Sequence, residues 1–157
     1  MKKIIISIIL IFWLGLIFFL SNQPANLSSN TSSRMMDKII NIIESITDSE
    51  LDDVTKSNIY EYGMKPLRKC AHFFLYFVLG ILLCSLVYQY KIDNIILISL
   101  LFCLLYACSD EIHQLFISGR SGNIKDVFID TMGSLLGIFI ISKVYKIKTK
   151  KNDNLHI

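Results

Sequence analysis

The amino-acid sequence predicts an all-α integral membrane protein, a bundle of four transmembrane helices with an extracytoplasmic amphipathic helical loop between the first and the second. Two observations lead to this fold class. Apolar residues make up 53% of the 157 residues and charged residues only 18%, against about 25% charged residues in an ordinary soluble domain. The apolar residues are also gathered in four runs, each close to the ~20 residues that a helix needs to cross a bilayer.

The first run covers residues 4–20 and contains no charged residue. Lys2 and Lys3 precede it, as they would precede a signal peptide. The run is longer than the ~7–15 apolar residues of most signal peptides, and no small-x-small cleavage site follows it. We therefore expect this segment to be retained as a transmembrane helix.

The second element is a long polar loop, residues 21–67. Its first part, 21–33, is rich in Ser and Asn and predicts an irregular linker. Apolar residues three and four apart then predict an amphipathic helix, with the stripe formed by Met36, Ile39, Ile40, Ile43 and Ile46. Thr47 with Glu50 three residues later resembles a capping box, which predicts a second short helix through about Tyr60. These helices are expected to cover the bundle or to lie on the membrane surface.

The remaining spans are predicted at residues 70–90, 94–116 and 127–142, and a basic tail follows at 143–157. Lysines are concentrated at the two ends of the chain, whereas the loop 21–67 holds seven acidic and four basic residues. Cytoplasmic segments of membrane proteins carry the excess of Lys and Arg. An even number of spans then places both termini in the cytoplasm and the loop outside.

Composition excludes several other classes of protein. The net charge is only +3, and the basic residues are not interleaved with aromatic ones, so nucleic acid is not an expected partner. The sequence has no Gly-rich phosphate loop, CxxC or HExxH motif, and we expect no cofactor and no resident metal. The four cysteines lie inside apolar runs, where cysteine packs as a small inert hydrophobe: Cys70, Cys84, Cys103 and Cys108.

Ionisable residues within the spans indicate a site, because a charged group in a membrane is costly and usually paired or functional. In the second span Arg68, His72 and Tyr76 are four residues apart and share one helical face. In the third span Asp110 shares a face with His113 and Gln114, while Glu111 lies partly to one side. In the fourth span Asp126 and Asp130 are four apart.

Depth in the membrane places these residues in one layer. His72 and Asp130 each lie about one turn from the outer end of their spans, and Asp110 lies roughly 22 Å from the inner end of its span. The sequence therefore predicts one polar binding site in the outer third of the bilayer. Its predicted members are Gln23, Arg68, Lys69, His72, Tyr76, Asp110, Glu111, His113, Gln114, Arg120, Asp126 and Asp130.

Structural roles also fit single members of this set. Asp126 is placed to cap the fourth helix, Arg120 to neutralise an acid, and Tyr76 to belong to the core. Gly133 and Gly137 form a G-x-x-x-G pattern, which is typical of helix packing. An ion-pair network accounts for any two of these features, but it accounts less well for all of them at one depth.

The same residues resemble the VanZ-like family. The resemblance rests on the motif SNQP at 21–24, on RKCAHFFLYFVLG at 68–80 and on DEIHQLFISGRSGNIKDVFIDTMGSLLG at 110–137, in order along nearly the whole chain. The first motif departs slightly from the SSQP that is common in the family, and the first outer loop is rather long. The family is named for an accessory membrane protein of glycopeptide-resistance clusters linked to teicoplanin resistance. The resemblance therefore implies a multi-pass protein of the bacterial cell membrane.

Three functions fit these observations. The first is a protein that binds or protects a lipid-linked cell-wall component or a lipophilic glycopeptide, because Arg forms bidentate bonds with phosphates. The second is a hydrolase or transferase acting on a lipid head group, with catalytic candidates His72, Asp110, His113 and Asp130. In an alternative, metal-assisted form of this function, the same four residues hold a divalent metal ion. The third is a transporter or proton relay, for which the polar layer is too shallow. We rank binding above catalysis and catalysis above transport.

Overall fold

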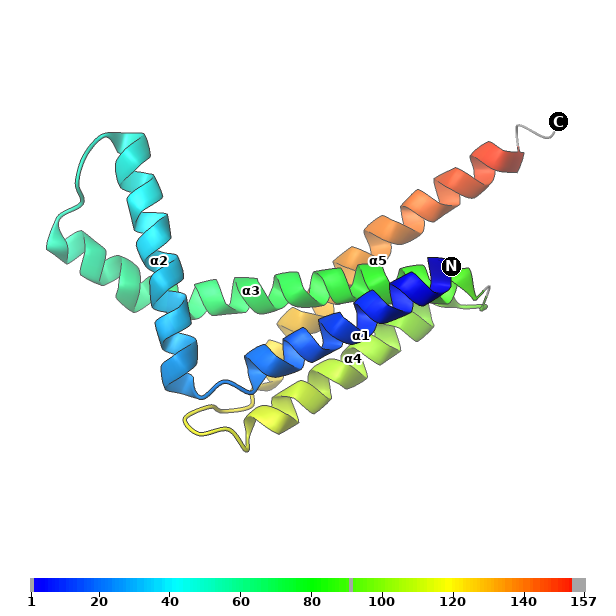
Figure 1. Ribbon diagram of the computed structural model, residues 1–157, viewed down its shortest axis with the longest axis horizontal. Coiled ribbons are helices and arrows are strands. Elements are labelled where there is room, and N and C mark those ends of the chain that lie inside the picture. Colours follow the sequence, from blue (N-terminus) through cyan, green and yellow to red (C-terminus); the bar gives the residue numbers. More distant parts are fainter. Residues whose placement is uncertain (1, 91, 154–157) are drawn as a thin grey trace.

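The computed structural model describes residues 2–90 and 92–153, and every regular element in this part of the chain is an α-helix (Figure 1). The helices are α1 (Lys2–Ser21), α2 (Ala25–Thr47), α3 (Asp53–Gln89), α4 (Ile95–Gln114) and α5 (Ile124–Asp153). The predicted all-α fold class is confirmed. The last four residues of the predicted basic tail, 154–157, lie outside the described residues.

Four of the helices are long and apolar enough to cross a membrane: α1, α3, α4 and the Ile124–Lys146 part of α5. Large apolar side chains cover their outer surface. Phe12 on α1 and Leu105 on α4, for example, are each 69% exposed. A soluble protein rarely leaves so much apolar surface uncovered, so the bundle is that of a multi-pass membrane protein in a lipid bilayer.

Helices α2 and α3 differ from the sequence-based expectations between the first two spans. The predicted irregular linker, 21–33, is helical from Ala25 onward. Thr47 ends α2 and does not begin a new helix. The next helix instead begins after Asp52, whose carboxylate accepts a hydrogen bond from the Thr55 backbone N–H at 3.2 Å. A carboxylate bonded to the N–H three residues later satisfies one of the free donors of a helix start.

Helix α3 then continues without interruption through the second span. Its 37 residues correspond to about 55 Å at 1.5 Å per residue, which exceeds the ~30 Å hydrocarbon core of a bilayer. Its N-terminal part projects beyond the bundle and changes direction in its first third (Figure 1). Pro66 lies inside α3, and proline removes one backbone hydrogen bond of a helix.

The projecting part of α3 packs against α2. Met36 and Ile40 of α2 are buried, and the Lys56 ammonium of α3 lies 2.9 Å from the Glu44 carboxylate of α2. Ile39 and Ile46, which belong to the same predicted stripe, remain exposed. Only part of the predicted apolar face of α2 is therefore covered within this chain.

Helices α3 and α5 form the most extensive helix pair of the bundle. Small residues permit their close approach: a Cβ atom added at Gly133 would meet the Phe73 carbonyl oxygen, and one added at Gly137 would meet the Phe77 carbonyl oxygen. Close backbone contact through small residues is the usual way in which helices associate in a membrane. The packing interpretation of the G-x-x-x-G pattern is thus the one that fits the structure.

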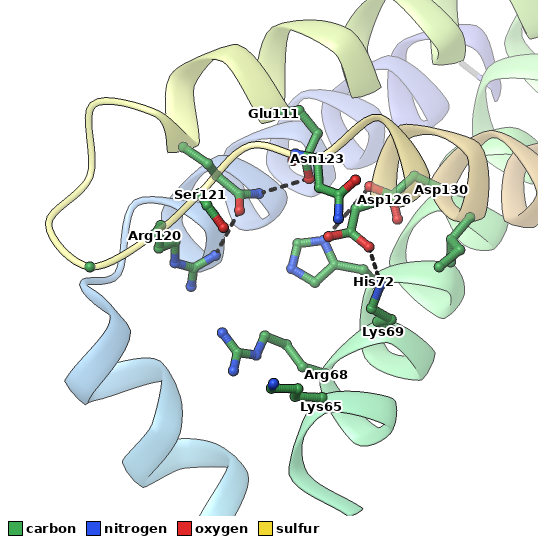
Figure 2. Close-up of a pocket in the computed structure, with 13 residues that line it drawn as sticks. Lys65, Arg68, Lys69, His72, Glu111, Arg120, Ser121, Asn123, Asp126 and Asp130 are labelled. Carbon is green, nitrogen blue, oxygen red and sulfur yellow. Dashed lines mark hydrogen bonds and ion pairs between the residues drawn. The ribbon is translucent and has the colours of Figure 1, made fainter.

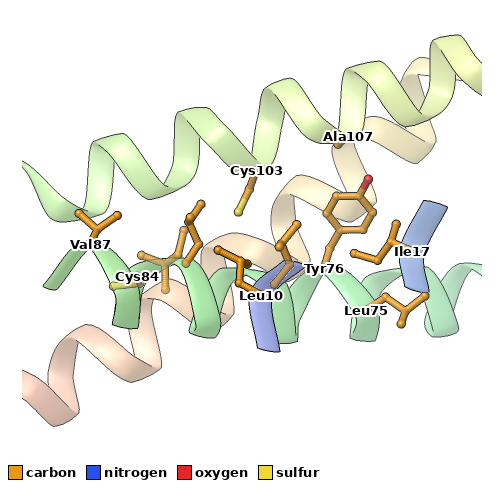
Figure 3. Packing of buried hydrophobic residues seen from close by; sticks show 11 residues of the cluster. Leu10, Ile17, Leu75, Tyr76, Cys84, Val87, Cys103 and Ala107 are labelled. Atoms are coloured by element: carbon orange, nitrogen blue, oxygen red, sulfur yellow. The ribbon is translucent and has the colours of Figure 1, made fainter. Parts of the chain in front are cut away.

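The core of the bundle is apolar and contains two of the four cysteines (Figure 3). Cys84 and Cys103 are fully buried in the same apolar cluster as Tyr76, as expected for inert packing. Cys70 is exposed and Cys108 half-buried, so the expectation of buried packing is wrong for Cys70. All four are free thiols.

The two ends of the bundle differ in composition. One end holds the start of α1 and the turn between α3 and α4, where the Lys3 ammonium lies 4.6 Å from the centre of the Tyr90 ring. The opposite end holds the α1–α2 connection, the α4–α5 loop and the projecting part of α3 (Figure 1). The polar residues that the sequence indicated lie at this second end.

Candidate functional site

A cavity of about 350 Å³ lies at this end of the bundle, between α3, the end of α4, the α4–α5 loop and the start of α5 (Figure 2). Eight of the residues predicted from the sequence line it: Arg68, Lys69, His72, Glu111, Gln114, Arg120, Asp126 and Asp130. Most of the expected polar layer therefore converges on one cavity, although its function stays a prediction.

The α4–α5 loop is fixed to the end of α4 by a buried carboxylate. Glu111 accepts a hydrogen bond from the Asn123 backbone N–H at 2.8 Å and one from the Gln114 side-chain amide at 3.4 Å. Gly119 provides the loop with a residue at φ +74°, a conformation that costs other residues free energy. Glu111, which we expected to lie partly to one side, is thus buried at the cavity and orders its rim.

Arg120 ties this loop to the end of α1. Its guanidinium donates hydrogen bonds to the Gln23 carbonyl at 2.8 Å, to the Leu20 carbonyl at 3.2 Å and to the Gln114 side-chain oxygen at 3.3 Å. The arginine therefore satisfies backbone groups left free at the end of a helix. The interpretation that Arg120 neutralises an acid by direct pairing is not supported among the described residues.

Four basic side chains line the cavity. Lys69 forms an ion pair with Asp126, while Lys65 and Arg68 stand apart from this network (Figure 2) and have no ion-pair partner among the described residues. Burial and the nearby positive charge of Arg68 lower the pKa of Arg120 below its ordinary value. The two guanidinium groups therefore act on the same space, which attracts anions.

His72, Asp110 and Asp130 gather at the inner side of the cavity and are called the floor triad below. His72 and Asp130 line the cavity, and Asp110 is buried next to them without lining it. His72 Nδ1 lies 3.8 Å from Asp130 Oδ2, which is too long for a hydrogen bond. Asp110 is buried and accepts hydrogen bonds from the Ser21 hydroxyl at 2.8 Å and from the Gln114 amide at 3.3 Å. One ligand atom from each of the three residues lies within 4.8 Å of the others.

Three predicted residues belong neither to the cavity lining nor to the floor triad. The Tyr76 ring lies fully buried in the core, with its hydroxyl unpaired among the described residues. Gln23 contributes its backbone carbonyl to Arg120 rather than its side chain. His113 is turned away: its Nε2 lies 3.2 Å from the Asn22 side-chain oxygen, and its ring stacks on Phe18.

Helical phase explains the wrong placement of His113. Successive residues of an α-helix are about 100° apart, so residue i+3 lies about 60° to one side of residue i and residue i+4 about 40° to the other. Glu111 lies on the same side of Asp110 as Gln114, and the cavity is on that side. The i+3 position therefore faces α1 and not the cavity.

Other cavity residues were not anticipated: Lys65, Gly119, Ser121, Asn123 and Ile129. Ser21, the partner of Asp110, was also missed. Most of these residues are uncharged and lie in loops or at a helix end, where the period of a helix gives no direction. The motif at 21–24 was the one available signal for Ser21.

Two chemical properties are therefore combined. The rim provides positively charged side chains that suit a phosphate or carboxylate ligand. Some of them are held by hydrogen bonds or an ion pair, and others have no ion-pair partner among the described residues. The floor provides an imidazole beside two carboxylates, residue types that serve in proton transfer or metal binding.

A model of the VanZ/LLP1 family matches residues 6–146, nearly the whole chain. The matched range contains every residue that lines the cavity. No curated protein and no solved structure gives a significant match.

Proposed function

The chain belongs to the VanZ/LLP1 family, and we propose that in this member the cavity binds the anionic head group of a lipid-linked molecule. The ligand class is a lipid-linked cell-wall component or a lipophilic glycopeptide. Its head group occupies the cavity and its apolar tail lies along the outer surface of the bundle. The protein thereby binds or protects that molecule at the outer leaflet of the bacterial cell membrane.

One observation carries this proposal: Lys65 and Arg68 line the cavity without an ion-pair partner among the described residues. Cations gathered in a concave site attract an anionic ligand and raise its local concentration. Arginine is suited to phosphate because its planar guanidinium forms two parallel hydrogen bonds with phosphate oxygens. A diphosphate or a sugar phosphate is therefore the favoured type of head group.

The position of the cavity supports a ligand with an apolar tail. It lies at the end of four helices whose outer surface is apolar. A molecule with its head group between α3 and the α4–α5 loop reaches that surface directly. The volume of about 350 Å³ lies at the lower end of the range of small-molecule sites, ~300–1,000 Å³, so it fits a head group rather than a whole lipid.

The cytoplasmic placement of both termini is part of this proposal. The end of the bundle that holds the start of α1 and the α3–α4 turn lies opposite the end that holds the cavity (Figure 1). With the chain ends inside, the cavity and α2 face the outside of the cell. Lipid-linked wall precursors and glycopeptides are present on that side.

A second candidate is a membrane-embedded hydrolase or transferase acting on the same head group. His72 at the cavity floor, 3.8 Å from Asp130, favours it because a carboxylate commonly orients a histidine that acts as a general base. The two functions differ in outcome, since only an enzyme releases a changed head group. Mass spectrometry of the lipid recovered after incubation distinguishes them.

The proposal is tested with the full chain in lipid nanodiscs and a polyisoprenyl diphosphate as probe. We expect saturable binding, and Arg68→Ala is expected to weaken it about tenfold or more, because hydrogen bonds to charged groups contribute about 1.5–3 kcal/mol. Arg34→Ala is the matched control, since Arg34 is exposed on α2 and does not line the cavity. A second titration uses teicoplanin.

Two results would contradict the proposal. One is equally tight binding of the uncharged polyisoprenol, which would show that the cations do not recognise the head group. The other is an equal loss of affinity in Arg34→Ala and Arg68→Ala, which would indicate attraction by overall charge.

A further inference from the structure

We infer that the floor triad is a binding site for one divalent transition-metal ion, with His72, Asp110 and Asp130 as its protein ligands. From the sequence we expected no resident metal, and a divalent ion held by these residues together with His113 was the alternative under the enzyme function; the structure turns His113 away from the group. The inference deepens the proposed function, because it places a second cationic group beneath the same head group.

The strongest support is the state of the Asp130 carboxylate. Asp130 is only 1% exposed, and both of its oxygens are buried without a hydrogen-bond partner among the described residues. An ionised carboxylate in such surroundings is costly unless it is paired or coordinates a metal. His72 Nδ1, at 3.8 Å, is too distant for a hydrogen bond and pairs with the carboxylate only when the imidazole is protonated.

Asp110 adds a second acidic group at the same point. It is 4% exposed, and one of its oxygens lies within 4.8 Å of both other ligand atoms. Two carboxylates so close together require a positive charge or a shared proton between them. Arg120 does not provide the charge, since its hydrogen bonds go to two carbonyls and one amide oxygen.

The residue types and their supports match those of known metal sites. An imidazole nitrogen with carboxylate oxygens suits Zn²⁺ or Mn²⁺, whereas Ca²⁺ takes six to eight oxygen ligands. Ligand atoms bound to one ion at ~2.1 Å lie at most ~4.2 Å apart, so small side-chain rotations close the present arrangement. The Ser21 hydroxyl and the Gln114 amide orient Asp110, as outer hydrogen bonds orient metal ligands elsewhere.

The ion would have coordination positions left for a ligand. Three protein ligands leave at least one position open in a tetrahedral site, and His72 and Asp130 face the cavity (Figure 2). The open position therefore points to the space assigned to the head group. A phosphate oxygen held by Arg68 above and by the ion below would be bound from both sides.

The experiment is a Mn²⁺ titration of the full chain in detergent after treatment with EDTA, followed by electron paramagnetic resonance of the free ion. We expect one Mn²⁺ per chain, displaced by Zn²⁺. Asp130→Asn and Asp110→Asn, which keep the side-chain shape, should each weaken binding at least tenfold. Asp53→Asn is the matched control, because Asp53 is an exposed acid in the first turn of α3, and it should bind as the wild type does.

Absence of stoichiometric Mn²⁺ and Zn²⁺ binding to the wild type would overturn the inference, whether or not the variants fold. Unchanged affinity in Asp130→Asn would also overturn it. If the acids instead share a proton, Asp130→Asn leaves thermal stability unchanged or raised, and no ion binds. The titration contains no added lipid, and polyisoprenyl diphosphate binding is measured separately in EDTA, so the metal site and the lipid site fail independently.

Discussion

At the residue scale, the cavity depends on one arginine that forms no ion pair with any acid in the described part of the chain. Arg120 bonds to the Leu20 carbonyl near the end of α1 and to the Gln23 carbonyl of the α1–α2 connection, and it also bonds to Gln114 of α4. A single loop side chain thus joins three segments that are far apart in the sequence. Its role in the structure is to hold the rim of the cavity in place.

Arg120→Lys is expected to lower the stability of the protein although it keeps the charge. The ammonium cannot donate in three directions fixed by a plane, and partly buried acceptors that lose a donor cost up to about 1–3 kcal/mol. Thermal unfolding of the detergent-purified protein should show a lower Tm than that of the wild type. Arg34→Lys on the exposed face of α2 should leave Tm unchanged, and an equal Tm in Arg120→Lys would refute the anchoring role.

Individual residues were predictable where charge and helical spacing agreed. His72, Asp110 and Asp130 were indicated by the cost of charge within a span, and the structure brings them together. His113 was misplaced because its spacing from Asp110 fits a shared face only loosely. Ser21 was not found, because a hydroxyl at a helix end carries no such cost.

At the element scale, hydropathy predicted where the spans lie but not where the helices begin. The second span was expected from residue 70, whereas α3 begins at Asp53 and continues through it. The polar stretch before residue 70 is still helical because it packs against α2 and begins at the Asp52 cap. Hydropathy detects the segments that span a membrane, and it does not detect a polar segment that is helical for another reason.

The contact between α3 and α5 gives a prediction at this scale. Gly137→Leu is expected to destabilise the protein by about 1–3 kcal/mol or more, because a side chain there would meet the Phe77 carbonyl. Gly15→Ala on α1 is the matched control, since a Cβ atom at Gly15 meets nothing within 4 Å. The control should be neutral or stabilising by up to about 1 kcal/mol, because alanine favours a helix more than glycine does.

Both variants are compared by thermal unfolding in detergent and by the amount of protein that is inserted into the membrane. A Gly137→Leu protein as stable as Gly15→Ala would mean that α3 and α5 do not need their close approach. That outcome would also weaken the assignment of the cavity, which lies between the same two helices.

At the scale of the whole molecule, the bundle has a polar end and an apolar middle. The spans and their number were predictable from run length alone, because lipid imposes a strict length on a helix. The cavity was not, since it is closed by a loop whose path depends on Arg120, Glu111 and Gly119. We inferred that three helices contribute to one site because their polar residues lie at the same depth in the membrane. Depth gives the level of a residue along the bundle, but not the direction in which its side chain points.

The orientation in the membrane gives the last prediction. A reporter fused after Asn58, in the projecting part of α3, should be active outside the cell. Reporters fused after Asn94, in the α3–α4 turn, and after Asn152, near the end of α5, should be active inside. These outcomes follow from the lysines at both chain ends and the acidic loop between the first two spans. The reverse pattern would place the cavity in the cytoplasmic leaflet and remove extracellular ligands from consideration.

The proline within α3 has a mechanical consequence. Pro66 stands between Lys65 and Arg68, two cavity cations that have no ion-pair partner among the described residues, and a helix bends most easily where proline has removed a hydrogen bond. The part of α3 before this point packs against α2, and the part after it packs against α5. Bending at Pro66 would therefore change the spacing of Lys65 and Arg68 at the mouth of the cavity, whereas His72 and Asp130 both lie on the α5 side of the bend and would keep their spacing.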